Sequence, residues 1–484
     1  MSSLSKYQVD GYTPTIGIEC HVQFNTVSKL FTAIGNDAKD AAANTLIGPL
    51  CVGLPGTLPV LNEQAVHKAI LAGLAINAEI AEITRFDRKH YFYPDLPLGY
   101  QISQFDQPIV GEGWLNIPTD DGPLRINIER AHLEADAGKL SHPDGADYSL
   151  VDLNRAGTPL LEIVSMPDMH SAIEAKAYCR ELYLAMLYAG VSDCDLFHGN
   201  IRFDVNVSVS KDSSKLGTRT ETKNLNSFKN VERAVEFEIS RQIEELEAGN
   251  TIAQETRGWD DAKGQTFSQR SKEDAHDYRY MPDPDIPPLS ISRQQVNDIA
   301  KLAPHTPAHL RTILSKIDLK GSGLETLIDN PLAARMMARI VDEHDAATAK
   351  TIANWCTGEI LRMVGEQEVD WTDVEAAETG LTKLAAMVDG NQLSSTNAKE
   401  ILKPVIKNNA DPLKLAEEAD LLQMSDEADL VILVQKVMSD NPKAVEDAKA
   451  DPKAAGFLVG QIMKASRGKA NPKVVNQLIQ KELS

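Results

Sequence analysis

The stretch LRINIERAHLEADAGKL, residues 124–140, alternates with the period of two that a β-strand imposes. On a regular strand one face carries Ile126, Ile128, Arg130, His132, Glu134 and Asp136, and the other carries Asn127, Glu129, Ala131, Leu133 and Ala135. The first face therefore ends in an imidazole and two carboxylates. Two carboxylates so close together repel each other, which destabilises the fold unless a metal ion, a guanidinium or an ammonium lies among these groups. A solvated strand edge gives the same pattern, so this one strand does not decide between a site and a surface.

The same pattern recurs in three other stretches, which favours a site. In residues 16–23 the apolar Ile16, Ile18, Cys20 and Val22 alternate with Glu19, His21 and Gln23. In residues 201–209 Phe203, Val205, Val207 and Val209 alternate with Arg202, Asp204, Asn206 and Ser208, and residues 218–226 place Arg219, Glu221 and Lys223 on one face. The pattern predicts an α+β fold in which helices cover one face of an antiparallel sheet and the other face is charged. Carboxylates with a few cations suit divalent metal ions bridged to phosphates.

Two segments beside these strands carry further polar candidates. Residues 88–104 combine basic and aromatic side chains on an irregular loop, which either stacks on a base or anchors the loop. Residues 150–165 place Asp152, Asn154 and Arg155 before a Gly-Thr-Pro turn, with Glu162 in the strand-like run beyond. Helices are expected at 63–81 and, with Ser171 as N-cap, at 171–189.

The composition changes after a Pro-rich segment that ends near Leu289. Amphipathic helices are expected at 294–302, 308–317, 333–343, 347–363 and 381–389, with a second break near 407–412. Residues 456–484 carry Lys464, Arg467, Lys469, Lys473 and Lys481 against a single Glu482. A solvated helix tip and an RNA contact explain this basic end equally well.

The composition of the chain excludes several classes of protein. With 484 residues and a net charge of −21, it is expected to be a multidomain protein that does not coat nucleic acid non-specifically. It lacks an apolar run of transmembrane length and a signal or transit pattern at its start, so a cytoplasmic location without membrane attachment is expected. No phosphate-binding loop, dinucleotide fingerprint or G-x-S-x-G elbow occurs. A bound nucleotide would therefore lie on the sheet, and the absence of the elbow argues against a self-contained serine amidase or esterase.

Eight motifs together resemble the GatB family, one of the three components of the heterotrimeric aspartyl/glutamyl-tRNA amidotransferase. The resemblance extends over nearly the whole chain, and its motifs read GIECHVQ, RKHYFYPDLPLGYQISQFDQPI, HLEADAGK, SLVDLNRAGTPLLEIVS, IRFDVNVSV, TETKNLNSF, RSKEDAHDYRYMPDPDIPPL and GFLVGQIMKASRGKANP. Two positions depart from the family pattern. Ala135 stands where many members have a second Glu, and Cys51 with Gly48 stands where many have a C-x-x-C pair, which puts a zinc site in doubt.

The resemblance implies a tRNA-dependent amidation. A GatB protein would use ATP and Mg²⁺ to phosphorylate the side-chain carboxylate of Glu on tRNA(Gln) or Asp on tRNA(Asn). Ammonia from a separate glutaminase (amidase) subunit would then displace phosphate, and a small third subunit would be part of the heterotrimer. Which of the two mischarged tRNAs is the substrate stays open. The alternative is a non-catalytic scaffold that only holds the tRNA.

The resemblance also implies site residues and regions. It assigns Glu19, His21, Glu134, Asp204 and Glu221 to metal, and Lys89, Asn154, Arg155 and Lys223 to ATP, with Glu134, Lys89, Arg155 and Lys223 in catalysis. His132 and Asp136 would orient the metal ligands. Residues 1–291 would form the catalytic cradle, 292–408 a helical domain and 409–484 a tail domain, whose Lys464, Arg467, Lys469 and Lys473 would contact tRNA.

Overall fold

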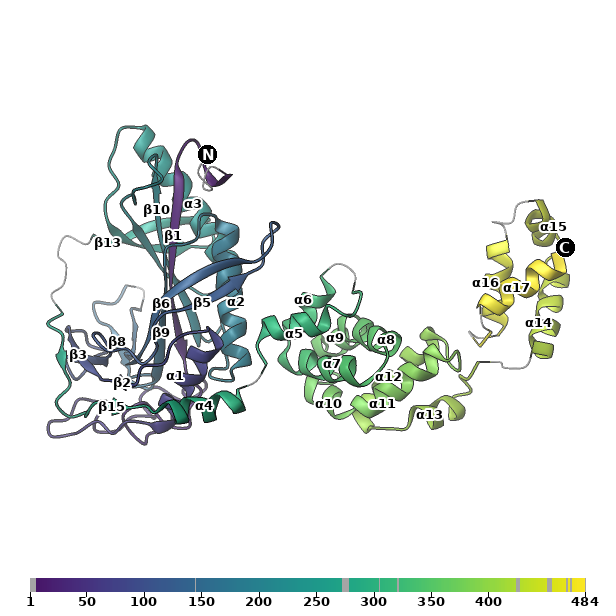
Figure 1. Cartoon of the computed structure of the whole chain (residues 1–484), viewed down its shortest axis with the longest axis horizontal. Helices are drawn as coiled ribbons and strands as arrows, with labels where there is room; N and C mark the ends of the chain where they lie inside the picture. The colour runs from purple at the N-terminus through teal and green to yellow at the C-terminus, as the bar shows by residue number, and fades with distance from the viewer. Residues whose placement is uncertain are drawn as a thin grey trace. The chain divides into compact units, whose positions relative to one another are not determined.

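The chain forms two compact units, each described here by itself, in a computed structural model (Figure 1). The structure describes residues 6–143, 145–271, 278–303, 305–319, 322–423, 427–450, 455–466, 469–470 and 472–483. Contacts divide the chain into residues 1–306, which contain all the named strands, and residues 307–484, which are helical. The predicted boundaries after residues 291 and 408 stay predictions.

An eight-stranded sheet, almost entirely antiparallel, forms the centre of the first unit. Its strand order is β13-β12-β11-β10-β1-β9-β6-β5, and only β11 and β12 run parallel. The strands are β1 (Thr13–Gln23), β5 (Gly113–Ile117), β6 (Leu124–Ala135), β9 (Pro159–Ser165), β10 (Ile201–Ser210), β11 (Thr220–Leu225), β12 (Glu255–Asp260) and β13 (Gln265–Ser271). This sheet confirms the predicted α+β class.

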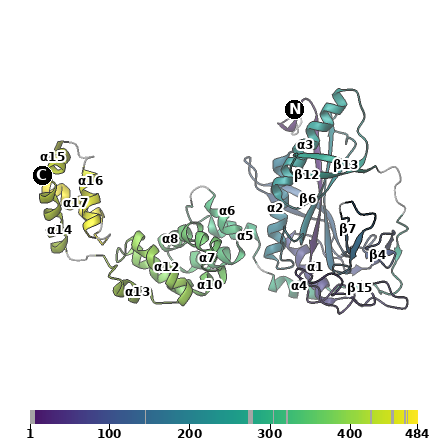
Figure 2. The ribbon, with the colours of Figure 1, turned by 180° about the vertical axis from the view of Figure 1, so that it is seen from behind.

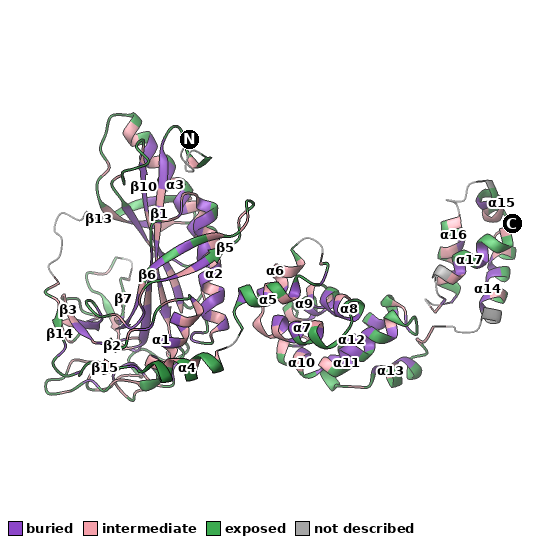
Figure 3. Cartoon of the chain, viewed as in Figure 1, coloured by how far each residue is buried: buried purple, intermediate pink, exposed green. Residues whose placement is uncertain are grey.

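Helices α2 (Ala172–Tyr188) and α3 (Phe228–Glu247) lie alongside the strands in both views of the ribbon (Figures 1 and 2). The apolar side chains of β1 and β10 join the core with residues of these helices, among them Tyr178, Leu182, Val231 and Val235. Burial is concentrated between the helices and the sheet (Figure 3). Ser171 caps α2 as predicted, since its hydroxyl accepts a hydrogen bond from the Glu174 N–H.

Strand β6 departs from the predicted alternation. The register against β9 shifts between Ile128 and Arg130, where a β-bulge inserts one residue. As a result Ile126 and Ile128 before the bulge and Ala131 and Leu133 after it all reach the same apolar core. The prediction that the two isoleucines share a face with His132 and Glu134 is therefore wrong. The bulge lets β6 keep its apolar side in the core on both sides of residue 129 while the polar side chains after it face the other way.

Smaller elements surround one end of this sheet. Helix α1 (Glu63–Ala75) is shorter than predicted, because Asn77 takes a left-handed φ of 53° soon after its last residue. The other elements are β2 (Ile83–Thr84), β3 (Asp87–His90), β4 (Tyr100–Ser103), β7 (Lys139–Ser141), β8 (Leu150–Asp152), β14 (Met281–Pro282), β15 (Leu289–Ser290) and α4 (Arg293–Leu302). Strand β3 is central in the sheet β14-β3-β4, so it joins segments that lie about 190 residues apart in the sequence.

The second unit contains only helices among its named elements. They are α5 (Pro307–Leu314), α6 (Gly323–Ile328), α7 (Pro331–Glu343), α8 (Ala346–Thr357), α9 (Glu359–Gly365), α10 (Trp371–Ala376), α11 (Glu378–Asp389), α12 (Ser395–Asn408), α13 (Pro412–Glu418), α14 (Glu427–Asp440), α15 (Pro442–Ala450), α16 (Ala455–Ala465) and α17 (Pro472–Leu483). The single helix predicted at 347–363 is wrong. Gly358 breaks it, with φ −122° and ψ −97°, angles that no helix accommodates. Within the described residues, no helix has the length and apolarity needed to cross a membrane.

Candidate active site

The polar side chains of β1 lie on the sheet face opposite the helices. Strand register sets them beside polar side chains of the neighbouring strands. His21 is opposite Arg202 of β10 on one side and Glu162 of β9 on the other, and Glu162 is opposite His132 of β6. One row across four strands therefore reads His132, Glu162, His21 and Arg202, with a single carboxylate among three nitrogen-bearing side chains.

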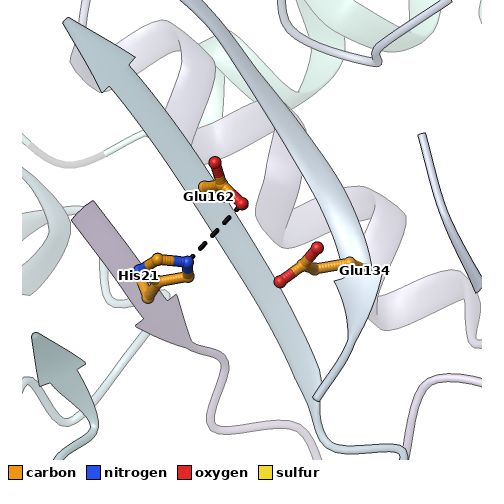
Figure 4. Close-up of side chains that lie close together, drawn as sticks. All are labelled: His21, Glu134 and Glu162. Carbon is orange, nitrogen blue, oxygen red and sulfur yellow. Dashed lines mark ion pairs between the residues drawn. The ribbon is translucent and has the colours of Figure 1, made fainter. Parts of the chain in front are cut away.

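A first cluster of possible metal ligands consists of His21, Glu134 and Glu162, whose ligand atoms all lie within 4.8 Å of one another. Figure 4 shows the three side chains converging from three strands. The His21 Nε2 lies 3.5 Å from a Glu162 oxygen, and the His132 Nε2 lies 3.5 Å from the same oxygen. Glu134, which is 5% exposed, accepts a hydrogen bond from the Ser103 hydroxyl at 3.3 Å.

A second cluster consists of Glu19, Asp204 and Glu221, also within 4.8 Å of one another. Lys223 pairs with two of these carboxylates, at 3.2 Å from Asp204 and 2.8 Å from Glu221. The Asn206 amide donates to Glu19 at 3.0 Å. The five predicted metal ligands are thus divided between two clusters, which β1 links because Glu19 and His21 are two residues apart on one face.

The charges in the clusters shift one another's pKa values. Burial disfavours the imidazolium of His21, but the Glu162 carboxylate more than offsets this and raises the pKa of His21 to about 9. Conversely, burial is outweighed at Glu162 by His132 and His21, which lower its pKa. Burial together with Glu162 and Glu221 raises the pKa of Glu19. Lys223 has a raised pKa, because Asp204 and Glu221 outweigh its burial. His21, Glu19 and Lys223 therefore hold their protons more tightly than the free groups do, whereas Glu162 stays ionised.

Lys89 projects from β3 among aromatic rings. Its ammonium lies 4.8 Å from the centre of the Tyr278 ring and 5.7 Å from that of Tyr91. Burial lowers its pKa, but Glu134, Tyr280 and Glu162 raise it overall. No described carboxylate forms an ion pair with Lys89, so its charge faces the first cluster without a direct partner.

Asn154 and Arg155 occupy the turn before β9 and bind mainly the protein itself. The Asn154 side chain accepts from the Leu46 N–H at 2.8 Å and donates to the Ala42 carbonyl at 2.7 Å. Arg155 donates to the carbonyls of Ala137 and Gly138 at 3.0 and 2.7 Å. These contacts hold two loops at the edge of the site, and the predicted binding of ATP by either residue stays a prediction.

Two residues of this face were missing from the predicted set. Glu162 is the carboxylate shared by His21 and His132, and Arg202 lies next to His21 in the same row. Glu162 is the one charged residue in the otherwise apolar strand Pro159–Ser165, and this exception could have identified it as a site residue. Of the two predicted orienting groups, His132 lies 3.6 Å from Glu134, and Asp136 accepts from the Gln23 amide at 2.9 Å.

The predicted RNA-binding residues lie in the second unit. Lys464 is exposed at the end of α16, whereas Lys469 is mostly buried and pairs with Asp420. Lys473 lies in α17, and Arg467 lies outside the described residues. Their contact with tRNA stays a prediction.

The donor set of both clusters fits divalent cations of the magnesium type. The second cluster offers only carboxylate oxygens, and the first offers two carboxylates and an imidazole nitrogen. The Nε2 atoms of His21 and His132 face these carboxylates, and their buried Nδ1 atoms have no hydrogen-bond partner among the described residues. The doubt about a zinc site at Cys51 stays a prediction. The sulfur of Cys51 lies 3.5 Å from the ammonium of the buried Lys29. A cation at that position disfavours a metal ion.

Two family models match the chain. The GatB/GatE catalytic domain matches residues 14–297, which include both clusters, and the GatB domain matches residues 336–483.

Curated relatives are similar over almost the entire length. The chain is 43% identical to the GatB protein of the aspartyl/glutamyl-tRNA(Asn/Gln) amidotransferase from Persephonella marina over 475 residues, covering 98% of this chain and 99% of the relative. It is also 43% identical to the proteins of the same name from Thermoanaerobacter sp. over 480 residues and Carboxydothermus hydrogenoformans over 485 residues, with 98% of this chain and 99% of each relative covered.

Proposed function

The chain belongs to the GatB family, as a subunit of a tRNA-dependent amidotransferase, and from this premise we propose that its sheet activates the side-chain carboxylate of a mischarged tRNA. The reaction would use ATP to phosphorylate Glu on tRNA(Gln), Asp on tRNA(Asn), or both. Ammonia would then displace phosphate to give the amide. The observation that carries this proposal is the pair of ligand clusters on one sheet face, beside cations that do not belong to either cluster.

The chemistry explains why such a face is needed. A carboxylate is a poor acyl donor because oxide would have to leave, whereas an acyl phosphate has a stable leaving group. Mg²⁺ bound at the clusters would neutralise phosphate charge, and it would be held by His21, Glu134 and Glu162 and by Glu19, Asp204 and Glu221. The protein's own part is to orient these ligands and to hold phosphate oxygens with fixed cations.

Lys89 is the cation best placed to hold a phosphate oxygen. Lys223 is paired with two carboxylates, whereas the Lys89 ammonium rests against two tyrosine rings and forms no ion pair among the described residues. The rings fix the position of the ammonium without neutralising it, which keeps its charge available to an incoming anion. Asn154 and Arg155 would support the site through the loops that they hold.

The source of nitrogen lies outside this chain. The sequence has no nucleophile elbow, so we propose that a partner glutaminase supplies ammonia and that a small third protein completes the heterotrimer. The basic end of the chain, including the exposed Lys464, would contact the tRNA body. A cytoplasmic location fits these partners.

A non-catalytic tRNA scaffold is the second candidate. A tRNA-holding surface should be basic, whereas this face carries six ligand groups of which five are carboxylates. The acidic face would repel RNA phosphate unless metal ions neutralise it. The scaffold function therefore suits the helical second unit better than the sheet.

Replacing Lys89 with methionine is expected to lower tRNA-dependent ATP cleavage by about 10²-fold, because one preorganised charge in a dehydrated site contributes about this much. The measurement uses the purified assembly with ammonium in place of glutamine and with Glu-tRNA(Gln) or Asp-tRNA(Asn). The matched control is Lys176→Met on α2, which lies outside the site. The Lys176 ammonium forms an ion pair with Glu232 at 2.7 Å. Cleavage by Lys89→Met within twofold of the control would contradict the role of this ammonium.

A further inference from the structure

Arg202 stands next to the first cluster on the polar face of the sheet. It is opposite His21 in the register of β1 and β10, and Asp204 of the second cluster follows two residues later on the same strand. Its side chain is only 19% exposed. The guanidinium therefore lies beside the first cluster, where it reaches Asp136, and most of its surface is removed from water.

Most hydrogen-bond donors of Arg202 are unused. One contact is present, from an Nη2 to Asp136 Oδ1 at 3.5 Å, and no described residue accepts a hydrogen bond from its Nε or Nη1. Arg155, which also lies near Asp136, instead gives its Nε and Nη2 to two backbone carbonyls. These free donors are not among the fully buried atoms that lack a partner, so they are accessible to solvent and to an incoming anion.

Asp136 orients Arg202 without neutralising it fully. Its other oxygen accepts from the Gln23 amide at 2.9 Å and lies 3.4 Å from the Arg155 Nε, so Asp136 is shared among several donors. This leaves the guanidinium fixed on one side and open on the other. The N–H donors of a guanidinium lie in one plane and form a fork of two parallel hydrogen bonds. This fork matches an anion with two oxygens in one plane, such as a carboxylate.

We propose that Arg202 binds the side-chain carboxylate of the aminoacyl group and thereby distinguishes the carboxylate substrate from the amide product. The inference rests on the proposed function and deepens it by naming the group that recognises the substrate. A carboxylate accepts from two N–H groups of the fork, whereas an amide presents its own NH₂ to one of these donors and loses that contact. The amide product is thus bound more weakly and leaves.

The test is equilibrium binding of Glu-tRNA(Gln) and Gln-tRNA(Gln) to the purified assembly without ATP, with the corresponding Asp and Asn pair in parallel. We expect the wild type to bind at least one carboxylate form about 10-fold more tightly than its amide, since a charge-assisted hydrogen bond contributes about this factor. Arg202→Met should abolish this preference, because it weakens binding of the carboxylate form more than binding of the amide form. Arg202→Lys keeps the charge but not the fork, and should retain only part of the preference.

The control is Arg233→Met on α3, which removes an arginine that pairs with Asp261 outside the site. It should keep the full preference. Equal binding of carboxylate and amide by the wild type for both pairs, or an unchanged preference in both Arg202 variants, overturns the assignment of Arg202. Neither result contradicts the proposed function. That proposal is contradicted if ATP cleavage by the same assembly does not depend on Glu134.

Discussion

Replacing Glu162 with glutamine is expected to lower tRNA-dependent ATP cleavage by about 10³-fold. This carboxylate belongs to the first cluster and is the common partner of His21 and His132. Glutamine has the same shape but no charge, so a divalent cation loses an anionic ligand, is bound more weakly and neutralises less phosphate charge. The measurement is the rate of phosphate release by the purified assembly with ammonium and mischarged tRNA.

The control for this variant is Glu232→Gln on α3, where the carboxylate pairs with Lys176. Both variants should give the circular dichroism spectrum of the wild type, because glutamine fills the same volume. Loss of activity in Glu162→Gln with an unchanged spectrum assigns the effect to the charge. Activity within tenfold of the wild type would exclude Glu162 from the metal site.

Replacing Glu238 with alanine is expected to destabilise the sheet unit by about 3–5 kcal/mol, the usual effect of removing one partner from a buried ion pair. Glu238 is fully buried on α3 and accepts from Arg241 and from the Thr220 hydroxyl, both at 2.7 Å. Its carboxylate also lies 3.0 Å from Arg257, which is itself only 8% exposed. Without Glu238, Arg257 keeps its ion pair with Glu255, but Arg241 and the buried hydroxyls of Thr220 and Thr266 lose this acceptor. The measurement is the free energy of unfolding in urea.

The contribution of Glu238 to the free energy of unfolding should be lost at low pH. Burial opposes its ionisation, but the hydrogen bonds of Arg241 and Thr266 more than offset this and lower its pKa. A lowered folded-state pKa stabilises the fold fully above the ordinary carboxyl pKa, and this contribution is lost as the pH falls through the lowered value. The difference between wild type and Glu238→Ala should therefore shrink below about pH 4. The exposed Glu236→Ala should change stability by less than about 0.5 kcal/mol at any pH.

The sequence predicted those parts of the fold that depend on local pattern. Strands β1 and β10 alternate regularly over their whole length, so their polar faces and the residues Glu19, His21 and Asp204 could be assigned to one surface. The faces of strand β6 could not be assigned in this way. Its bulge arises from pairing with β9, and the sequence of β6 alone does not indicate it.

The parts that could not be predicted depend on contacts between distant segments. The surroundings of Lys89 arise because the backbone of residues 278–282 pairs with β3, about 190 residues away. The division of the ligands into two clusters depends on register across β9, β1, β10 and β11. The spare donors of Arg202 follow from the sharing of Asp136, which no sequence pattern encodes.

The central claim is that this sheet transfers a phosphoryl group to the side-chain carboxylate. The most direct measurement uses Glu-tRNA(Gln), with Asp-tRNA(Asn) in parallel, labelled with ¹⁸O in that carboxylate, together with ATP, ammonium and the purified assembly. We expect one ¹⁸O atom to appear in the released phosphate with the wild type and no transfer with Glu134→Gln. Phosphate free of label from the wild type, or labelled phosphate formed at the wild-type rate by Glu134→Gln, would contradict the claim.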